Sequence, residues 1–155
     1  MAVAMFYHLT RSSPAETLAA LLPRARAQGW RVMIRSPNRA ALERLDTALW
    51  IDPPDSFLPH GIEGGPQDAD QPVLLGQGAA VNGAKGLFLL DGADVSVAEI
   101  QPMERVWVLF DGGDGAAVQA ARVKWKTLTA AGIPAQYWSE ESGRWQKKAD
   151  SAEKG

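Results

Sequence analysis

The stretch VAMFYHLTRSSPAETLAALLPRARAQGWRVMIR, residues 3–35, decides the fold. It opens with a short apolar run of residue types that favour β-strands, residues 3–9. The tetrapeptide SPAE at 13–16 then supplies a helix N-cap, a proline at the first helical position and an early acid, which predicts a helix over 14–28. A glycine ends that helix, and residues 30–35 form a second strand candidate. The order strand, helix, strand is typical of an α/β fold.

The same alternation continues toward the carboxyl end. We predict a second helix after Ser36-Pro37-Asn38, an exposed irregular loop at 52–71, strands at 73–75, 87–90, 105–110 and 133–138, a mobile connection at 76–86, and a helix at 115–131 capped by Asp114. The sequence therefore predicts a three-layer α/β/α sandwich with a mostly parallel sheet, in one domain over residues 1–145. Residues 146–155 are polar and are expected to form a loose tail.

Composition narrows the class of protein. The chain has 155 residues, of which 46% are hydrophobic and 22% charged, and this suits one compact domain. It contains no cysteine, so disulfides, thiolate nucleophiles and thiolate metal sites are excluded. No apolar run approaches the roughly 18 residues of a membrane helix, and no signal peptide is recognisable, so we expect a cytoplasmic protein with no membrane contact.

Charge is segregated along the chain although the net charge is only −2. Residues 1–45 carry seven arginines and two glutamates, residues 46–115 are strongly acidic, and residues 116–155 are mildly basic. Such a chain lacks the broad basic surface that nucleic-acid coating needs, whereas a local basic patch suits an acidic peptide.

An α/β fold raises the possibility of nucleotide binding, which depends on a glycine-rich loop after the first strand. Here that loop, residues 8–14, contains no glycine. The segment GAAVNGAKG at 78–86 approaches a phosphate-loop spacing, but an alanine precedes its lysine and no serine or threonine follows. The expected fold is thus Rossmann-like without a phosphate-binding loop, and no cofactor is implied.

Carboxylates at strand ends leave one enzymatic alternative open. In a small nucleotide- or metal-dependent enzyme, Asp91, Asp94 or Asp111 would hold a metal ion. The favoured interpretation makes Asp91 and Asp94 solvated turn residues, while Asp111 and Asp114 satisfy turn amides and cap the next helix. His8 and His60 lack a neighbouring triad or metal-ligand pattern and are assigned to packing or hydrogen bonding.

The last helix carries the strongest candidate surface. At 100° per residue, one stripe contains Val118, Arg122, Trp125 and Thr129, while Lys124 and Lys126 flank the tryptophan. An aromatic ring, an aliphatic side chain and a guanidinium together suit an apolar side chain attached to a carboxylate. The alternative, an ordinary solvated helix with Trp125 at the edge of the core, stays open at this point.

Ordered segments of the sequence resemble the chi subunit family of bacterial DNA polymerase III. The resemblance spans about residues 5–138, and the block from Arg44 to His60 is its most specific part. The segments that carry it are Phe6-Tyr7-His8-Leu9, Arg44-Leu45-Asp46-Thr47-Ala48-Leu49-Trp50, Asp55-Ser56-Phe57-Leu58-Pro59-His60, Pro72-Val73, the apolar run ending at Asp111, Trp125-Lys126 and Ala131-Gly132.

The resemblance implies a non-catalytic adaptor that contacts DNA only indirectly. It implies binding of the acidic C-terminal tail of single-stranded DNA-binding protein at a surface containing Val118, Arg122, Lys124, Trp125, Lys126 and Thr129. The family's tail-binding arginine falls on Arg122, but a basic residue expected one turn earlier is Val118 here. A second surface would bind the psi subunit, or another clamp-loader or helicase-like protein, through Trp50, Phe57, Leu58, Pro59 and His60.

Overall fold

The computed structural model describes residues 2–51 and 60–151. Its helices are α1 (Pro14–Ala27), α2 (Arg39–Ile51), α3 (Val97–Ile100) and α4 (Gly115–Ala130), with a 3₁₀ turn at Asp68–Asp70. Its strands are β1 (Val3–Leu9), β2 (Val32–Arg35), β3 (Gly61–Ile62), β4 (Val73–Gly76), β5 (Gly86–Leu89), β6 (Arg105–Asp111), β7 (Ala135–Ser139) and β8 (Gln146–Asp150).

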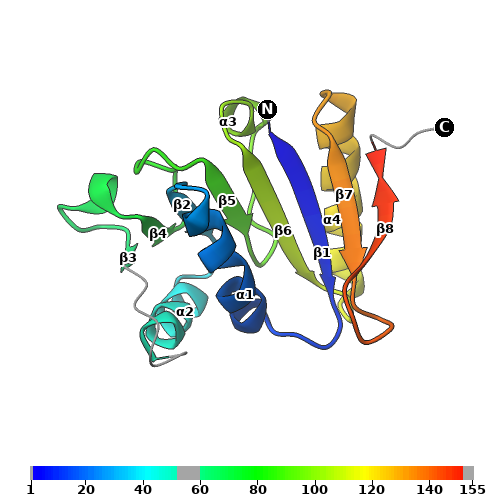
Figure 1. Ribbon diagram of the computed structural model, residues 1–155, viewed down its shortest axis with the longest axis horizontal. Coiled ribbons are helices and arrows are strands. Elements are labelled where there is room, and N and C mark those ends of the chain that lie inside the picture. Colours follow the sequence, from blue (N-terminus) through cyan, green and yellow to red (C-terminus); the bar gives the residue numbers. More distant parts are fainter. Residues whose placement is uncertain (1, 52–59, 152–155) are drawn as a thin grey trace.

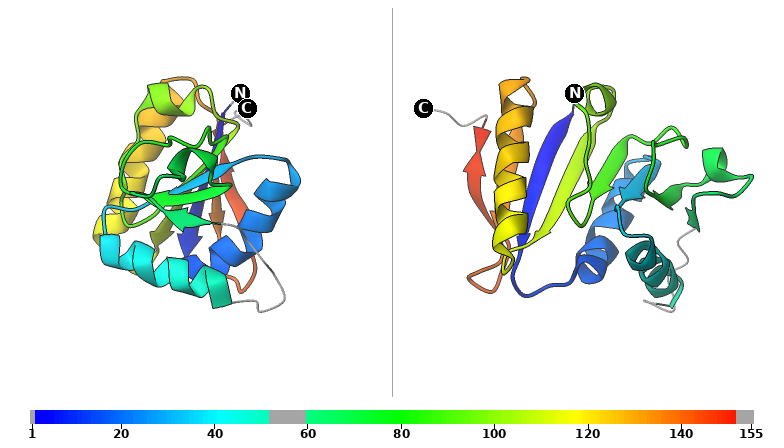
Figure 2. Two further views of the ribbon diagram at one scale, coloured as in Figure 1. Left: turned by 90° about the vertical axis from the view of Figure 1, so that its left-hand side faces the viewer. Right: turned by 180° about the vertical axis from the view of Figure 1, so that it is seen from behind.

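The strands form one sheet in the order β3-β4-β2-β5-β6-β1-β7-β8, and β8 is the antiparallel member. Helices α1 and α2 lie in front of this sheet in Figure 1, and α4 lies behind it. The view from behind in Figure 2 brings α4 to the front. The predicted three-layer α/β/α sandwich with a mostly parallel sheet is therefore confirmed.

Each face of the sheet has its own hydrophobic core. Successive β1 side chains alternate between the faces, so Phe6 packs under α4 and Tyr7 packs on the α1 side. Leu128 of α4 belongs to the first core, and Leu18 of α1 belongs to the second. Almost every residue of β1 and β6 is buried, because helices cover these strands on both faces of the sheet.

The predicted helix starts are confirmed. The Ser13 hydroxyl accepts a hydrogen bond from the Glu16 amide at 3.1 Å, and the Glu16 carboxylate accepts one from the Ser13 amide at 3.0 Å. Asp114 caps α4 by accepting from the amides of Ala116 and Ala117. These caps satisfy amide groups that the first turn of a helix leaves unpaired.

The prediction of a loose tail from residue 146 was wrong for the segment that forms β8. Gln146–Asp150 pairs with β7 after a turn at Gly143, whose φ is 96°. The Ser151 hydroxyl also accepts a hydrogen bond from the Ala135 amide at 2.8 Å. The polar sequence of β8 gives no strand pattern, because the middle residues of this edge strand are exposed. The strand forms through backbone hydrogen bonds to β7.

In their described parts, two connecting segments contain regular structure or buried side chains that the sequence does not indicate. The loop expected at 52–71 contains the short strand β3 and the 3₁₀ turn. In the connection between β4 and β5, Asn82 and Ala84 are buried, and the Asn82 side chain donates to the carbonyl oxygens of Val32 and Gln71. The sequence predicts only a mobile connection at 76–86 and does not indicate this packing. Helix α3, whose Ser96–Glu99 capping box resembles that of α1, was not predicted.

Residues 2–51 and 60–151 contain no helix with the length and hydropathy that a bilayer crossing requires.

Candidate functional site

Helix α4 presents the predicted stripe on the side that faces β1 and β7. Its start is fixed by the Asp114 cap, and its inner face is fixed by the buried Ala121 and Leu128. Arg122, one residue after Ala121, is exposed. We call the set Val118, Arg122, Trp125, Lys126 and Thr129, together with Tyr137 of β7, the α4 surface.

Trp125 is half-buried and holds the centre of the α4 surface. Its ring meets Phe6 edge-to-face, with the two centroids 5.3 Å apart, and meets Tyr137 in the same manner at 6.4 Å. Val118, one turn before Arg122, also packs partly against this core. Trp125 thus lies at the edge of the core, as the alternative interpretation predicts, and it keeps part of its surface accessible.

Tyr137 links the α4 surface to the interior. Its hydroxyl shares a 2.7 Å hydrogen bond with His8 Nδ1. Burial raises the Tyr137 pKa, the positive charge of Arg122 opposes that shift, and the Glu141 carboxylate adds to it. Tyr137 is therefore a neutral neighbour of the exposed Arg122 guanidinium.

His8 is held in place by close packing. It stacks on Phe110 with centroids 5.3 Å apart, and Glu141 lies 3.9 Å from its Nδ1. A Cβ atom at Gly112 would overlap the His8 ring and lie 3.0 Å from the Leu9 carbonyl oxygen. The packing and hydrogen-bonding role predicted for His8 is confirmed, and Gly112 is the residue whose missing side chain makes room for it.

The two lysines beside Trp125 point in different directions. Lys124 lies on the other side of α4, where its Nζ is 4.0 Å from Asp94 Oδ1. Lys126 is exposed one turn after Arg122, so these two cations share one helix face. The Thr129 hydroxyl donates to the Trp125 carbonyl oxygen at 2.8 Å. The structure therefore groups Lys126 with Arg122 and separates Lys124 from them.

Sequence reasoning missed the aromatic neighbours of Trp125. Phe6 and His8 share one face of β1, and Tyr137 stands on the same face of β7, directly opposite Phe6. Strand alternation places Phe6 and His8 on one side, but the pairing of β1 with β7 is needed to bring Tyr137 beside them. That pairing joins segments about 130 positions apart in the sequence.

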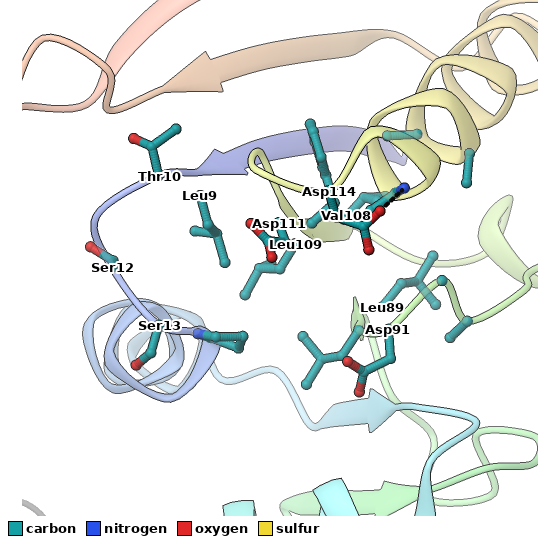
Figure 3. A pocket seen from close by; sticks show the side chains of 18 of the residues that line it. Leu9, Thr10, Ser12, Ser13, Leu89, Asp91, Val108, Leu109, Asp111 and Asp114 are labelled. Carbon is teal, nitrogen blue, oxygen red and sulfur yellow. Dashed lines mark hydrogen bonds between the residues drawn. The ribbon is translucent and has the colours of Figure 1, made fainter.

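A separate pocket of about 840 Å³ lies at the carboxyl ends of β1, β5 and β6. Figure 3 shows Asp91, Asp111 and Asp114 around it, with Leu9, Leu89 and Leu109 along its wall. Doubly wound α/β proteins bind ligands in this position, so the pocket is where the nucleotide-dependent alternative would have to act.

The backbone amides of the loop after β1 bind a carboxylate of the chain itself, that of Glu140. Glu140 Oε2 accepts hydrogen bonds from the amides of Thr10, Arg11 and Ser12 at 3.1, 3.0 and 2.8 Å. Its Oε1 accepts a fourth from the Ser12 hydroxyl at 2.8 Å. Burial raises the Glu140 pKa, but these hydrogen bonds outweigh it and the net pKa is lowered. Amides that would contact a phosphate are thus committed to a carboxylate.

Asp111 and Asp114 at this pocket have the structural roles predicted for them. Asp111 Oδ1 accepts from the Gly113 amide at 2.8 Å, and Asp114 caps α4. Asp91, which has a positive φ of 55°, accepts from the Ser36 hydroxyl at 2.7 Å. Within residues 2–51 and 60–151, no three carboxylate or imidazole side chains gather closely enough to hold a metal ion.

A comparison with known protein families shows which family the chain belongs to. Residues 1–136 match the family model described as DNA polymerase III chi subunit, HolC. The chain belongs to the chi family. Chi is a subunit of DNA polymerase III, so this chi-family chain is an accessory component of DNA replication. No curated protein matches the chain.

The second predicted surface of this chi-family chain falls largely outside the described residues. Phe57, Leu58 and Pro59 lie there, as does the side chain of Trp50 in α2. His60 is described and is buried, with its Nε2 3.1 Å from both the backbone oxygen and Oδ1 of Asp46. His60 therefore anchors the start of β3 to α2, as the packing role predicted for it requires.

Proposed function

We propose that this chi-family chain is a non-catalytic adaptor that acts in the cytoplasm. Its α4 surface binds the acidic C-terminal tail of single-stranded DNA-binding protein, and a second surface links that protein to the clamp loader through the psi subunit. The observation that carries the proposal is the exposed Arg122 beside the half-buried Trp125 and Tyr137.

The chemistry of the α4 surface suits an acidic chain end with an apolar side chain. The guanidinium offers a charge-assisted hydrogen bond to a carboxylate, and the open part of Trp125 offers apolar contact. Lys126, one turn along, adds a second cation for a preceding acid. A disordered tail must be ordered on binding, so we expect weak and reversible capture. Many tails on one coated strand would raise the effective concentration and compensate for weak single contacts.

Val118 weakens this site relative to the pattern expected of the family. A basic residue would stand one turn before Arg122, and an aliphatic side chain stands there instead. Lys124 does not replace it, because its ammonium lies near Asp94 on the other side of the helix. The proposed tail site therefore relies on Arg122 and Lys126, and its affinity should fall with added salt.

Calorimetric titration with an acidic tail peptide tests the site. Arg122→Ala removes a charge-assisted hydrogen bond and should weaken peptide binding by about tenfold or more. Trp125→Ala should weaken it comparably in variants shown to be folded. Lys124→Ala is the matched control, and its affinity should stay within about twofold of the parent. If both the Arg122 and the Trp125 variant bound the peptide with unchanged affinity, the peptide would bind elsewhere and the proposed site would be wrong.

The proposed link to the psi subunit rests on the residues carried over from the family resemblance. Phe57, with Trp50, Leu58 and Pro59, forms the proposed contact, and buried His60 supports it without direct contact. Phe57→Ala should abolish capture of psi, or of a helicase-like protein at the same surface, and leave peptide affinity unchanged. Loss of both activities in a folded variant would contradict the two-surface proposal.

A further inference from the structure

A second aromatic and basic surface lies on the opposite face of the sheet from α4. It is a groove of about 630 Å³ between α1 and strands β1, β6 and β7. We call it the aromatic groove, and we define it by the lining residues Tyr7, Arg24, Trp30, Arg105, Trp138 and Trp145. The proposed adaptor function uses none of these residues.

The rings of the aromatic groove come from distant parts of the chain. Tyr7 and Trp138 stand opposite each other on β1 and β7, and their rings are nearly parallel with centroids 6.5 Å apart. Trp145 meets Tyr7 edge-to-face at 5.0 Å. Trp30, Trp138 and Trp145 are all half-buried, so each keeps part of its surface accessible. Half-open tryptophans gathered in one concave place offer flat apolar surface to a ligand.

Two guanidinium groups stand at the same groove. Arg105 lies over the rings of Trp30 and Trp107, with its Cζ 5.6 and 6.0 Å from the centroids, and its buried Nε has no hydrogen-bond partner. Arg24 of α1 is exposed. Burial raises the Tyr7 pKa, and the charges of Arg105 and Arg24 both oppose that shift. The two positive charges therefore converge on the aromatic floor.

Little negative charge opposes these arginines. Among the described residues, neither Arg24 nor Arg105 forms an ion pair with a carboxylate. Glu16 is the one acid that lines the groove, and its carboxylate already accepts a hydrogen bond from the Ser13 amide. The groove thus suits a ligand that combines flat apolar faces with negative charge.

We propose that the aromatic groove binds single-stranded nucleic acid. An unpaired base lies flat against an indole ring while its polar edge stays in water, and the neighbouring phosphates meet Arg24 and Arg105. An acidic peptide fits less well, because carboxylate side chains present no flat apolar face to the indole rings. This inference revises the expectation that the chain meets DNA only through its partners.

The proposed contact is weak, salt-sensitive and selective for single strands. Two arginines neutralise about two phosphates, so raising the salt from 50 to 200 mM should weaken binding about sevenfold. The net charge of −2 adds no general attraction for nucleic acid. A duplex hides its bases in the stack, so a duplex of the same length should bind at least fivefold more weakly than the single strand.

Fluorescence anisotropy of a labelled ten-residue oligothymidylate tests the proposal with the full chain. We expect saturable binding that Arg24→Glu weakens at least fivefold and that Trp138→Ala weakens similarly. Arg44→Glu changes the same charge on exposed α2 and is the matched control, with an expected effect below twofold. Arg122→Ala should also leave oligonucleotide binding unchanged, which separates this proposal from the adaptor proposal.

Three results would overturn the proposal. The first is no binding of the oligonucleotide at a protein concentration of about 1 mM in low salt. The second is binding that folded Arg24→Glu and Trp138→Ala variants retain in full. The third is capture of an acidic peptide, lost in Arg24→Glu, by a chain that does not bind the oligonucleotide, because the groove would then be a peptide site.

Discussion

Replacing Glu140 with glutamine removes the negative charge that holds the loop after β1. The parent carboxylate accepts four hydrogen bonds, three from backbone amides and one from the Ser12 hydroxyl, at 2.8 to 3.1 Å. Glutamine keeps the size of the side chain, and its carbonyl oxygen can still accept from the three amides, but these hydrogen bonds lose their charge assistance. Its NH₂ group faces the Ser12 hydroxyl, which must then accept the bond that it donates in the parent. Glu140 is buried whereas Thr10 and Arg11 are exposed, so water compensates for part of the loss.

We expect Glu140→Gln to lower the free energy of unfolding by about 3 kcal/mol at pH 7, equivalent to one or two charged hydrogen bonds. For a domain of this size that loss corresponds to a fall in Tm of about 6 to 12 °C. Urea unfolding followed by circular dichroism measures it. Glu141→Gln is the matched control, because the Glu141 carboxylate is next in sequence and mostly exposed. This substitution should change the free energy of unfolding by less than about 0.5 kcal/mol.

The pH dependence of the same variant tests the cause. The hydrogen bonds that Glu140 accepts hold its pKa in the folded protein below the ordinary value of a glutamate. Its stabilisation is therefore complete above about pH 4.5 and is lost as the pH falls through the folded-state pKa. The stability difference between the parent and Glu140→Gln should shrink between pH 5 and pH 3. A difference below 0.5 kcal/mol at pH 7, or one that stays constant to pH 3, would refute this account of Glu140.

Two further predictions concern Gly112 and the pocket at the carboxyl ends of the strands. Gly112→Ala should destabilise the fold by about 1 to 3 kcal/mol in urea unfolding, because the added methyl group meets His8, and a neutral result would contradict the close packing there. Nucleotides with magnesium should leave the Tm of the parent unchanged in a thermal-shift screen, because Glu140 occupies the loop amides. A ligand at a hundred times its Kd would add about 2.7 kcal/mol, so a clear upward shift would restore the enzymatic alternative.

The regular part of the fold was predictable because its signals are local. Each signal involves residues close together in the sequence. The signals are the alternating strand and helix patterns, the Ser13 and Asp114 caps, and the glycines after helix ends. These signals placed β1, α1 and α4 to within a residue or so. Strand β8 escaped prediction because its stability comes from the open edge of β7 and not from its own polar side chains.

The candidate site was predictable only in its helical part. Helix geometry joins Val118, Arg122, Trp125 and Thr129, and the same 100° rule explains why Lys124 lies on another side. Two other contacts form only when β7 pairs with β1. They are the ring contact between Trp125 and Tyr137 and the hydrogen bond from the Ser12 amide to the Glu140 carboxylate. No local pattern in the sequence encodes such tertiary contacts.

The most direct test of the adaptor account is an NMR titration of the ¹⁵N-labelled chain with an acidic tail peptide. The account predicts that the indole N–H signal of Trp125 and the backbone signals around Arg122 shift together and saturate. In Arg122→Ala the same signals should need at least about tenfold more peptide for the same shift. Shifts confined to Trp138 and Trp145 on the opposite face, or no shifts at saturating peptide, would contradict it.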